Sequence, residues 1–181
     1  QMIAKGLDFS NITLVAVLNA DLGMLIPDFR SHEKMFQLLS QVIGRSGRSH
    51  KIGQAIIQTY QPDNNLIHLV TNYQSKKFYN LHLDSRQSLK YPPFIRLVRL
   101  LFQSPNINQC IDSATKIYNI LKSEFYDSII GPLPCPIERL SNKVRYHILI
   151  KIKPEDLKFS LAKLKKIQDK KETLLNKNVK L

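Results

Sequence analysis

Two arginines, Arg45 and Arg48, are the residues in this sequence best suited to chemistry, because each follows a glycine and they lie three positions apart. A guanidinium group is planar and can pair with two phosphate oxygens at once, and a glycine lets the backbone approach a ligand closely. Gln41 and Gly44 stand just before them in the segment Gln-Val-Ile-Gly-Arg-Ser-Gly-Arg. This spacing suits the terminal phosphates of a nucleoside triphosphate, whose charge grows during hydrolysis. A basic surface turn is the alternative interpretation.

The elements around this segment are predicted to be a strand, a helix and a second strand. Residues 12–18 are almost all apolar, which is typical of a strand buried in a parallel sheet. The helix begins near Ser31 and leads into the arginines. Its apolar residues recur at the spacing of one helix face: Met35, Leu38, Leu39 and Val42. Residues 54–60 form the second short strand, so a ligand would lie where the strands end.

A second segment with chemical potential opens the chain. Gly6 permits close approach of the backbone, and Asp8 can accept hydrogen bonds from a ribose hydroxyl or orient a basic neighbour. A simple turn is the alternative role for Asp8. Asp21, at the carboxyl end of the first predicted strand, is a weaker candidate.

These two segments resemble the last two motifs of superfamily-two helicases: residues 5–9 match the earlier motif and residues 41–48 the later one. Further segments resemble the primosomal protein N-prime (PriA) family of replication-restart helicases, from residue 1 to about residue 151. They are Tyr-Pro-Pro-Phe at 91–94, Gly-Pro-Leu-Pro-Cys-Pro-Ile-Glu-Arg-Leu at 131–140 and Arg-Tyr at 145–146. Leu7 replaces the histidine that is usual in the family, and Asn19 replaces an acidic residue.

The resemblance implies an ATP-dependent 3′–5′ DNA helicase that recognises forked DNA and restarts replication by primosome assembly in the cytoplasm. Its partners would be single-stranded DNA, single-stranded DNA-binding protein and other primosome proteins. Matched by motif position, Arg45 and Arg48 would face the phosphates of ATP with Mg²⁺, and Gln41 would couple nucleotide state to lobe closure. The remaining motif residues complete the match: Gly6, Asp8 and Gly44 at the nucleotide and Lys5 at the nucleic acid.

Several motifs of a complete motor are absent from this sequence. It contains no Gly-x-x-x-x-Gly-Lys-Ser/Thr phosphate loop, no Asp-Glu-x-His motif and none of the cysteine pairs that bind zinc in the family. We therefore expect the chain to be one end of a longer polypeptide, with no metal site, and to be inactive as an ATPase alone. The alternatives are a non-catalytic DNA- or protein-binding module with relic motifs, and another superfamily-two translocase.

The composition favours a polyanionic partner. The chain of 181 residues carries a formal net charge of +13, and residues 91–181 alone hold seventeen Lys/Arg against eight Asp/Glu. Nucleic acid is the commonest partner of such a surface, although a solvated lysine-rich face is the simpler explanation. The longest apolar run is far shorter than a membrane span. Cys110 and Cys135 are expected to be reduced thiols, with Cys135 in a loop.

The fold class expected from these patterns is α/β: the end of a RecA-like second helicase lobe at residues 1–90, then a small α/β sandwich at 91–181. Proline residues after residue 90 mark the boundary. Beyond it we expect strands near 95–102, 129–130 and 145–151, a helix over 106–125, and a helix opening at Pro154. This β-α-β-β-α order predicts a split β-α-β arrangement.

A basic cluster in the second domain is a candidate surface for nucleic acid or a protein partner. It comprises Arg139, Lys143, Arg145 and Lys151 around a predicted turn, with Tyr146 among them. A positive patch next to an aromatic ring could hold a phosphate backbone or an acidic peptide tail. An ordinary lysine-rich surface is the alternative.

Overall fold

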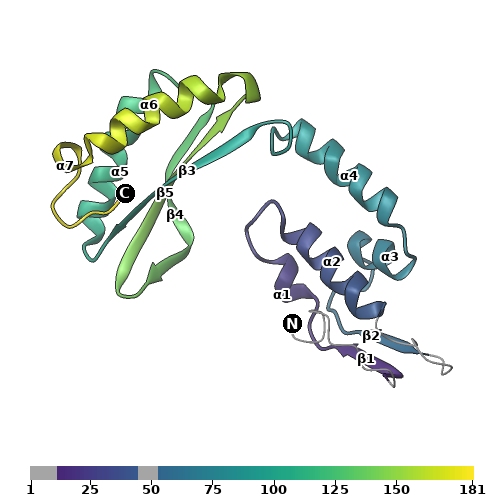
Figure 1. The fold of residues 1–181 in the computed structure, drawn as a ribbon. Helices are drawn as coiled ribbons and strands as arrows, with labels where there is room; N and C mark the ends of the chain where they lie inside the picture. The colour runs from purple at the N-terminus through teal and green to yellow at the C-terminus, as the bar shows by residue number, and fades with distance from the viewer. Residues whose placement is uncertain (1–11, 45–52) are drawn as a thin grey trace. The chain divides into compact units, whose positions relative to one another are not determined.

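The structure, a computed structural model, describes residues 12–44 and 53–181 (Figure 1). The chain divides into two compact units, Gln1–Leu83 and Asp84–Leu181. The division expected from the prolines, at residues 90 and 91, lies a few residues further on and remains a prediction about domain limits. No helix in the described parts of the chain is both long enough and apolar enough to cross a membrane.

In its described residues, the first unit has two short parallel strands and four helices. Strand β1 (Leu14–Val17) runs parallel to β2 (Gln54–Ile57), with Leu14 opposite Gln54 and Val17 opposite Ile57. The helices are α1 (Asp21–Met24), α2 (Ser31–Ile43), α3 (Asn65–Thr71) and α4 (Ser75–Ser88), the last of which continues past Leu83 into the second unit. The predicted strand–helix–strand order around the arginine segment is therefore present.

The core of the first unit is built on α2, which buries Met35, Phe36 and Leu39. The ring of Phe36 stacks on that of Phe78 from α4, with centroids 3.9 Å apart and planes within 10° of parallel. Buried apolar residues of α3 complete this core: Leu66, Ile67, Leu69 and Val70. The packing fixes the rotation of α2 and hence the side on which its last turn is exposed.

The second unit is a three-stranded antiparallel sheet with helices on one face. Its strands are β3 (Arg96–Ser104), β4 (Ile129–Leu140) and β5 (Lys143–Ile152), in the order β3-β5-β4. The helices are α5 (Ile107–Lys122), α6 (Leu157–Asp169) and α7 (Lys171–Leu174), and a 3₁₀ turn, η2 (Pro154–Asp156), precedes α6. Because β5 pairs antiparallel with both neighbours, β3 and β4 are parallel to each other and joined through α5. The unit is thus a mixed α/β domain with the expected β-α-β-β-α order.

The core of the second unit lies between the sheet and helices α5 and α6. Alternate residues of β5, among them Ile148 and Ile150, meet Ala114, Ile117 and Leu121 of α5. Figure 1 shows α5 and α6 on the same side of the sheet. Among the described residues of this unit no helix covers the opposite face, which carries the other alternating set of side chains.

Strand β4 is longer than predicted from the sequence. The prediction was short because the strand contains Pro132, Pro134 and Pro136, and proline argues against a strand. Proline lacks a backbone donor and is tolerated only at the edge of a sheet or at a bulge; β4 is an edge strand with two register shifts. Cys135 consequently lies in a strand and not in the expected loop. The hairpin to β5 turns at Ser141 and Asn142, whose φ angles are 50° and 59°. Two positive φ values match the twist of the flanking strands.

Asp28, just before α2, holds the entry to that helix in place. Its carboxylate accepts hydrogen bonds from Arg30 Nε at 3.2 Å and from Lys34 Nζ at 3.0 Å. Burial acts to raise the pKa of Asp28, but the hydrogen bonds and charges of Arg30 and Lys34 outweigh burial and hold that pKa well below its usual range. The native state is therefore stabilised by the ionised form of this residue.

We expect Asp28→Asn to lower the stability of the first unit at neutral pH. Because the pKa is depressed in the native state, the stabilisation is fully present above the unfolded pKa of about 3.9 and is lost as pH falls through the native pKa. Denaturation measured from pH 7 downwards should show the two curves converging under acid. Asp112→Asn, on an exposed turn of α5, is the matched control. A difference that stays constant down to acid pH would contradict this account.

Candidate functional site

Two of the predicted nucleotide-site residues, Gln41 and Gly44, lie at the end of α2. Gln41 lies exposed in the last turn, and Gly44 ends the helix with its N–H donating to the Ser40 carbonyl at 3.1 Å. The other predicted residues of this group lie outside the described residues: Lys5, Gly6, Asp8, Arg45 and Arg48. Their roles remain predictions.

The electrostatics of this helix end set a requirement for any phosphate site there. The C-terminal end of a helix carries a partial negative charge, which repels an anion. No basic residue occupies the last turn of α2. The last turn itself therefore supplies no positive charge, and the first basic residues after Gly44 in the sequence are Arg45 and Arg48.

Asp21 lies at the carboxyl ends of both strands of the first unit and is fully engaged there. Its carboxylate accepts hydrogen bonds from Thr59 Oγ1 at 2.7 Å and from the backbone N–H of Tyr60 at 3.0 Å. The Tyr60 N–H and then the Thr59 hydroxyl lower the pKa of Asp21. This buried carboxylate joins the ends of the two strands, so it has a structural use that the sequence did not reveal.

Asn19 stands where the resemblance leads one to expect an acidic residue. Its Oδ1 accepts hydrogen bonds from the backbone N–H groups of Asp21 at 3.0 Å and Leu22 at 3.2 Å, at the start of α1. An aspartate oxygen can accept the same two bonds. The departure therefore leaves this local geometry intact.

The uncovered face of the second unit is the clearest basic surface among the described residues. Strands β3 and β5 contain no acidic residue, but they contain Arg96, Arg99, Lys143, Arg145 and Lys151. Of these, Arg99, Lys143, Arg145 and Lys151 fall on the alternating set that faces away from α5 and α6. This set of four residues is called the basic sheet face below.

Arg145 is incompletely satisfied within the chain. Its Nη1 donates to the Ile137 carbonyl at 3.4 Å, and its Nε is buried with no hydrogen-bond partner among the described residues. A buried charged donor without a partner is costly, and an anion beside it removes that cost. No described carboxylate forms an ion pair with Arg99 or Arg145.

A buried Cys135–His147 pair lies on the same side of the sheet. The Cys135 Sγ and His147 Nδ1 are 3.2 Å apart. Burial, and next the charge of Arg99, lower the pKa of His147. Burial raises the pKa of Cys135, and the charges of Arg145 and Arg99 oppose that rise. Burial therefore favours the uncharged forms of Cys135 and His147. The pair carries no negative charge that could compensate the positive charges of Arg99 and Arg145.

The predicted cluster in this domain is divided between the two faces of the sheet. Lys143 and Arg145 lie on the basic sheet face. Tyr146 lies on the opposite face, where it pairs across from Phe102 and packs against the core. Arg139 pairs with Val144, which alternates with Arg145 and so belongs to the helix side. The aromatic ring of Tyr146 therefore lies on the other face of the sheet from Arg145. Arg99, which lies on the same face as Arg145, is the basic residue that sequence reasoning missed.

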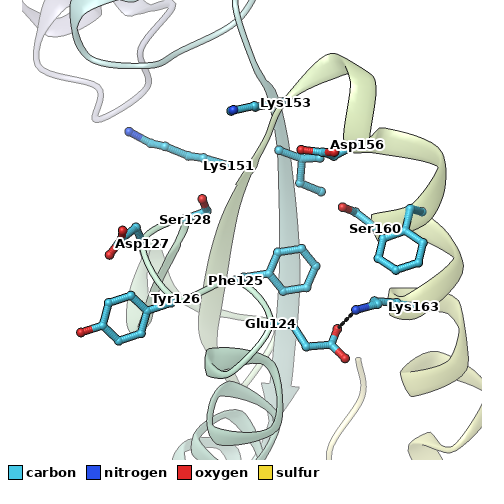
Figure 2. Close-up of a pocket in the computed structure, with 12 residues that line it drawn as sticks. Glu124, Phe125, Tyr126, Asp127, Ser128, Lys151, Lys153, Asp156, Ser160 and Lys163 are labelled. Atoms are coloured by element: carbon cyan, nitrogen blue, oxygen red, sulfur yellow. Dashed lines mark ion pairs between the residues drawn. The ribbon is translucent and has the colours of Figure 1, made fainter.

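A pocket of about 400 Å³ lies between α6 and the end of β5 (Figure 2). Lys163 Nζ pairs with Glu124 Oε2 at 3.1 Å at one end, and Figure 2 shows Lys151 and Lys153 towards the other. Lys151 Nζ also donates to the Leu89 carbonyl at 2.9 Å. The pocket also contains acidic residues in equal number to its lysines: Glu124, Asp127 and Asp156. Its charges are balanced, so it attracts a polyanion less than the basic sheet face does.

No three metal-ligating side chains come together within the described ranges, 12–44 and 53–181. The only thiol–imidazole contact there, Cys135 with His147, supplies two ligands. Structural zinc sites need four.

Comparison with known proteins identifies the family of this chain. Residues 87–180 match the Primosomal protein N C-terminal domain, which covers the whole split β-α-β sheet described above. The chain belongs to this family. Relatives named Replication restart protein PriA include that of Bacillus subtilis, 43% identical over 165 residues, and that of Chlamydia pneumoniae, 42% identical over 153 residues. These matches cover 90% and 83% of this chain and 20% of each relative, so the chain spans about a fifth of their length.

The PriA relative of Rickettsia prowazekii is 37% identical over 163 residues, covering 90% of this chain and 24% of the relative. Because these matches extend well beyond the matched C-terminal domain, part of the first unit is also shared with the relatives. The resemblance stated from the sequence is therefore confirmed at the level of the family.

Proposed function

We propose that this chain is the C-terminal part of a replication-restart protein that works as an ATP-dependent 3′–5′ DNA helicase and assembles a primosome at forked DNA. Membership of the PriA family and the names of the relatives support the restart role. The first unit supports the motor role, because two parallel strands flank a helix that leads directly into Gly-Arg-Ser-Gly-Arg. In this proposal the first unit is the end of a RecA-like second lobe.

ATP with Mg²⁺ would be held mostly by residues outside this chain. Within the chain, Arg45 and Arg48 would bind the terminal phosphates, and the exposed Gln41, in the last turn of α2, would couple the nucleotide state to lobe closure. ATP would supply the free energy through hydrolysis. Release of the charge contacts would then let the lobes separate. Gly6, Asp8 and Gly44 would complete this wall of the cleft.

DNA would be held in part by the basic sheet face, and the observation that carries this proposal is the unpaired charge there. Arg99 and Arg145 have no acidic partner among the described residues, and Arg145 Nε is buried without an acceptor. Phosphate oxygens would satisfy both guanidinium groups without any requirement for base sequence. Contacts with single-stranded DNA-binding protein and with other primosome proteins, implied by the resemblance, belong to the same proposal.

The double variant Arg99→Gln/Arg145→Gln tests the DNA-binding role in the full-length protein. Affinity for a forked duplex should fall by roughly 10- to 100-fold at moderate salt, and the slope of log affinity against log salt should flatten by about two, one per lost phosphate contact. Fluorescence anisotropy over a salt series measures both quantities. Lys116→Gln/Lys170→Gln removes the same charge from exposed positions outside the sheet and should leave the slope nearly unchanged. An equal slope for wild type and the sheet variant would reject the basic sheet face as a phosphate site.

A further inference from the structure

The pocket shown in Figure 2 is formed by several parts of the second unit. Its walls are the loop at residues 123–128 that follows α5, the end of β5, and η2 with the first turns of α6. Hydrogen bonds fix the loop: Ser128 N–H donates to the Phe125 carbonyl, and the Ser128 carbonyl accepts from Lys151 N–H, both at 2.7 Å. The volume of about 400 Å³ lies in the range of sites that bind small ligands.

Two aromatic rings at this pocket are open to solvent. Phe159 on α6 is 67% exposed, and Tyr126 in the loop is 74% exposed. Lys163 supports Phe159, because its Nζ lies 4.5 Å from the centroid of that ring and is also paired with Glu124. A nucleic-acid base has a flat π-face that stacks on such a ring, and stacking removes both surfaces from water. A planar ligand is therefore favoured here.

The charged groups of the pocket suit the two ends of a nucleotide. The carboxylates of Asp127 and Asp156 form no ion pair with any lysine or arginine among the described residues, so they can accept hydrogen bonds from an amino group. Lys153 has no carboxylate partner in the described ranges either, and Figure 2 shows it near Lys151 at the end of β5. Phosphate oxygens are suitable acceptors for both ammonium groups.

We propose that this pocket binds one unpaired nucleotide of single-stranded DNA and prefers bases that carry an amino group. The base would stack on Phe159, with its amino group at Asp127 or Asp156 and its phosphate at Lys151 and Lys153. Lys151 belongs both to the pocket and to the basic sheet face, so a strand held on that face by its phosphates would pass beside the pocket. The inference rests on the proposed binding of DNA and adds a site that distinguishes bases.

The preference between bases follows from their hydrogen-bonding groups. A carboxylate can only accept hydrogen bonds, and cytosine and adenine each offer an amino group as donor. Thymine presents the O4 carbonyl where cytosine has its amino group, and a carbonyl oxygen beside a carboxylate is unfavourable. We therefore expect cytosine strands to bind more tightly than thymine strands, although the two carry the same phosphate charge.

Fluorescence anisotropy with the full-length protein and short homopolymers of either base tests this preference. Wild type should bind oligodeoxycytidylate roughly 5- to 50-fold more tightly than oligothymidylate. Asp127→Asn/Asp156→Asn should narrow the difference, because an amide offers a donor as well as an acceptor. Equal affinity of wild type for the two oligomers would overturn the inference.

Phe159→Ala separates stacking from binding of the phosphate backbone. It should weaken binding of oligodeoxycytidylate by roughly 5- to 100-fold, and Phe159→Tyr should restore it. The slope of log affinity against log salt should stay as in wild type, because no charge is removed. Leu161→Ala, at an exposed position of the same helix outside this pocket, is the matched control.

The same data distinguish failure of the pocket from failure of the basic sheet face. Unchanged affinity in Phe159→Ala overturns the pocket, whereas the salt slope of the Arg99/Arg145 double variant reports on the sheet face alone.

Two further readouts identify the ligand. Iododeoxycytidine placed in the oligomer should cross-link on irradiation to peptides that contain Phe159 or Tyr126, and cross-links confined to other peptides would overturn the inference. Free deoxycytidine monophosphate should displace the oligomer only in large excess. Displacement at concentrations comparable to those of the oligomer would assign the pocket to a soluble nucleotide and would also overturn the inference.

Discussion

Replacing Arg45 by alanine in the full-length protein is expected to reduce DNA-stimulated ATP hydrolysis by ~10³-fold or more. The helix that leads to this residue ends with its negative pole and has no basic residue in its last turn. Positive charge at the terminal phosphates on this side would therefore come from Arg45 and Arg48. Arg45→Lys should fail nearly as badly, because an ammonium group lacks the planar fork that pairs with two oxygens.

The control for this experiment is Lys76→Ala, which removes an exposed cation from the start of α4 in the same unit. Its turnover should match that of wild type. Steady-state ATPase with saturating forked DNA, together with a thermal melt of each variant, separates loss of chemistry from loss of folding. A folded Arg45→Ala protein with turnover within a few-fold of wild type would remove this residue from the proposed motor.

Phe78→Ala is expected to destabilise the first unit by ~3–5 kcal/mol, the usual cost of emptying a buried phenylalanine site. Phe78 is 1% exposed, stacks on Phe36 and meets the ring of Tyr79 edge-on. The ring joins α4 to α2, so its loss should loosen the helix that leads to the arginine segment. Hydrogen exchange of α2 and α3 amides in the full-length protein measures the change, with α5 amides of the second unit as the internal reference.

Tyr79→Ala is the comparison for Phe78. Tyr79 is 37% exposed and lies at the rim of the same cluster, so its removal should cost much less. If Phe78→Ala lowers the stability of the first unit by less than about 1 kcal/mol, the Phe36–Phe78 stack does not anchor α2 as described.

The elements of the second unit could be predicted well because their patterns are local. The helix expected over 106–125 is present as α5 (Ile107–Lys122), and Asn106 caps it by accepting from the N–H groups of Asn108 and Gln109. The alternation expected over 145–151 is present in β5, which starts two residues earlier at Lys143. Strand β4 was predicted only at its first two residues, because its prolines argue against a strand unless its edge position is known.

The candidate sites were less accessible to sequence reasoning because they depend on pairing between distant segments. Tyr146 was predicted to lie beside Arg145 because the two are adjacent in the sequence, but successive residues of a strand face opposite sides of the sheet. Arg99 and Arg145 share one face of the sheet only because β3 pairs with β5, two strands that are distant in the sequence. The hydrogen bond between Asp21 and Thr59 could not be predicted either, because Thr59 follows β2 and is distant from Asp21 in the sequence. The roles of Arg45 and Arg48 come from the motif alone, since both lie outside the described residues.

Strand separation by the full-length protein tests the central proposal most directly. A forked duplex with one labelled strand should be unwound in the 3′–5′ direction when ATP and Mg²⁺ are present, and not with a non-hydrolysable analogue. Arg45→Ala should abolish unwinding while the protein still binds the fork through the basic sheet face. Salt-sensitive fork binding by wild type with no ATP-dependent strand separation would contradict the account, and would favour a DNA-binding module that retains helicase motifs as relics.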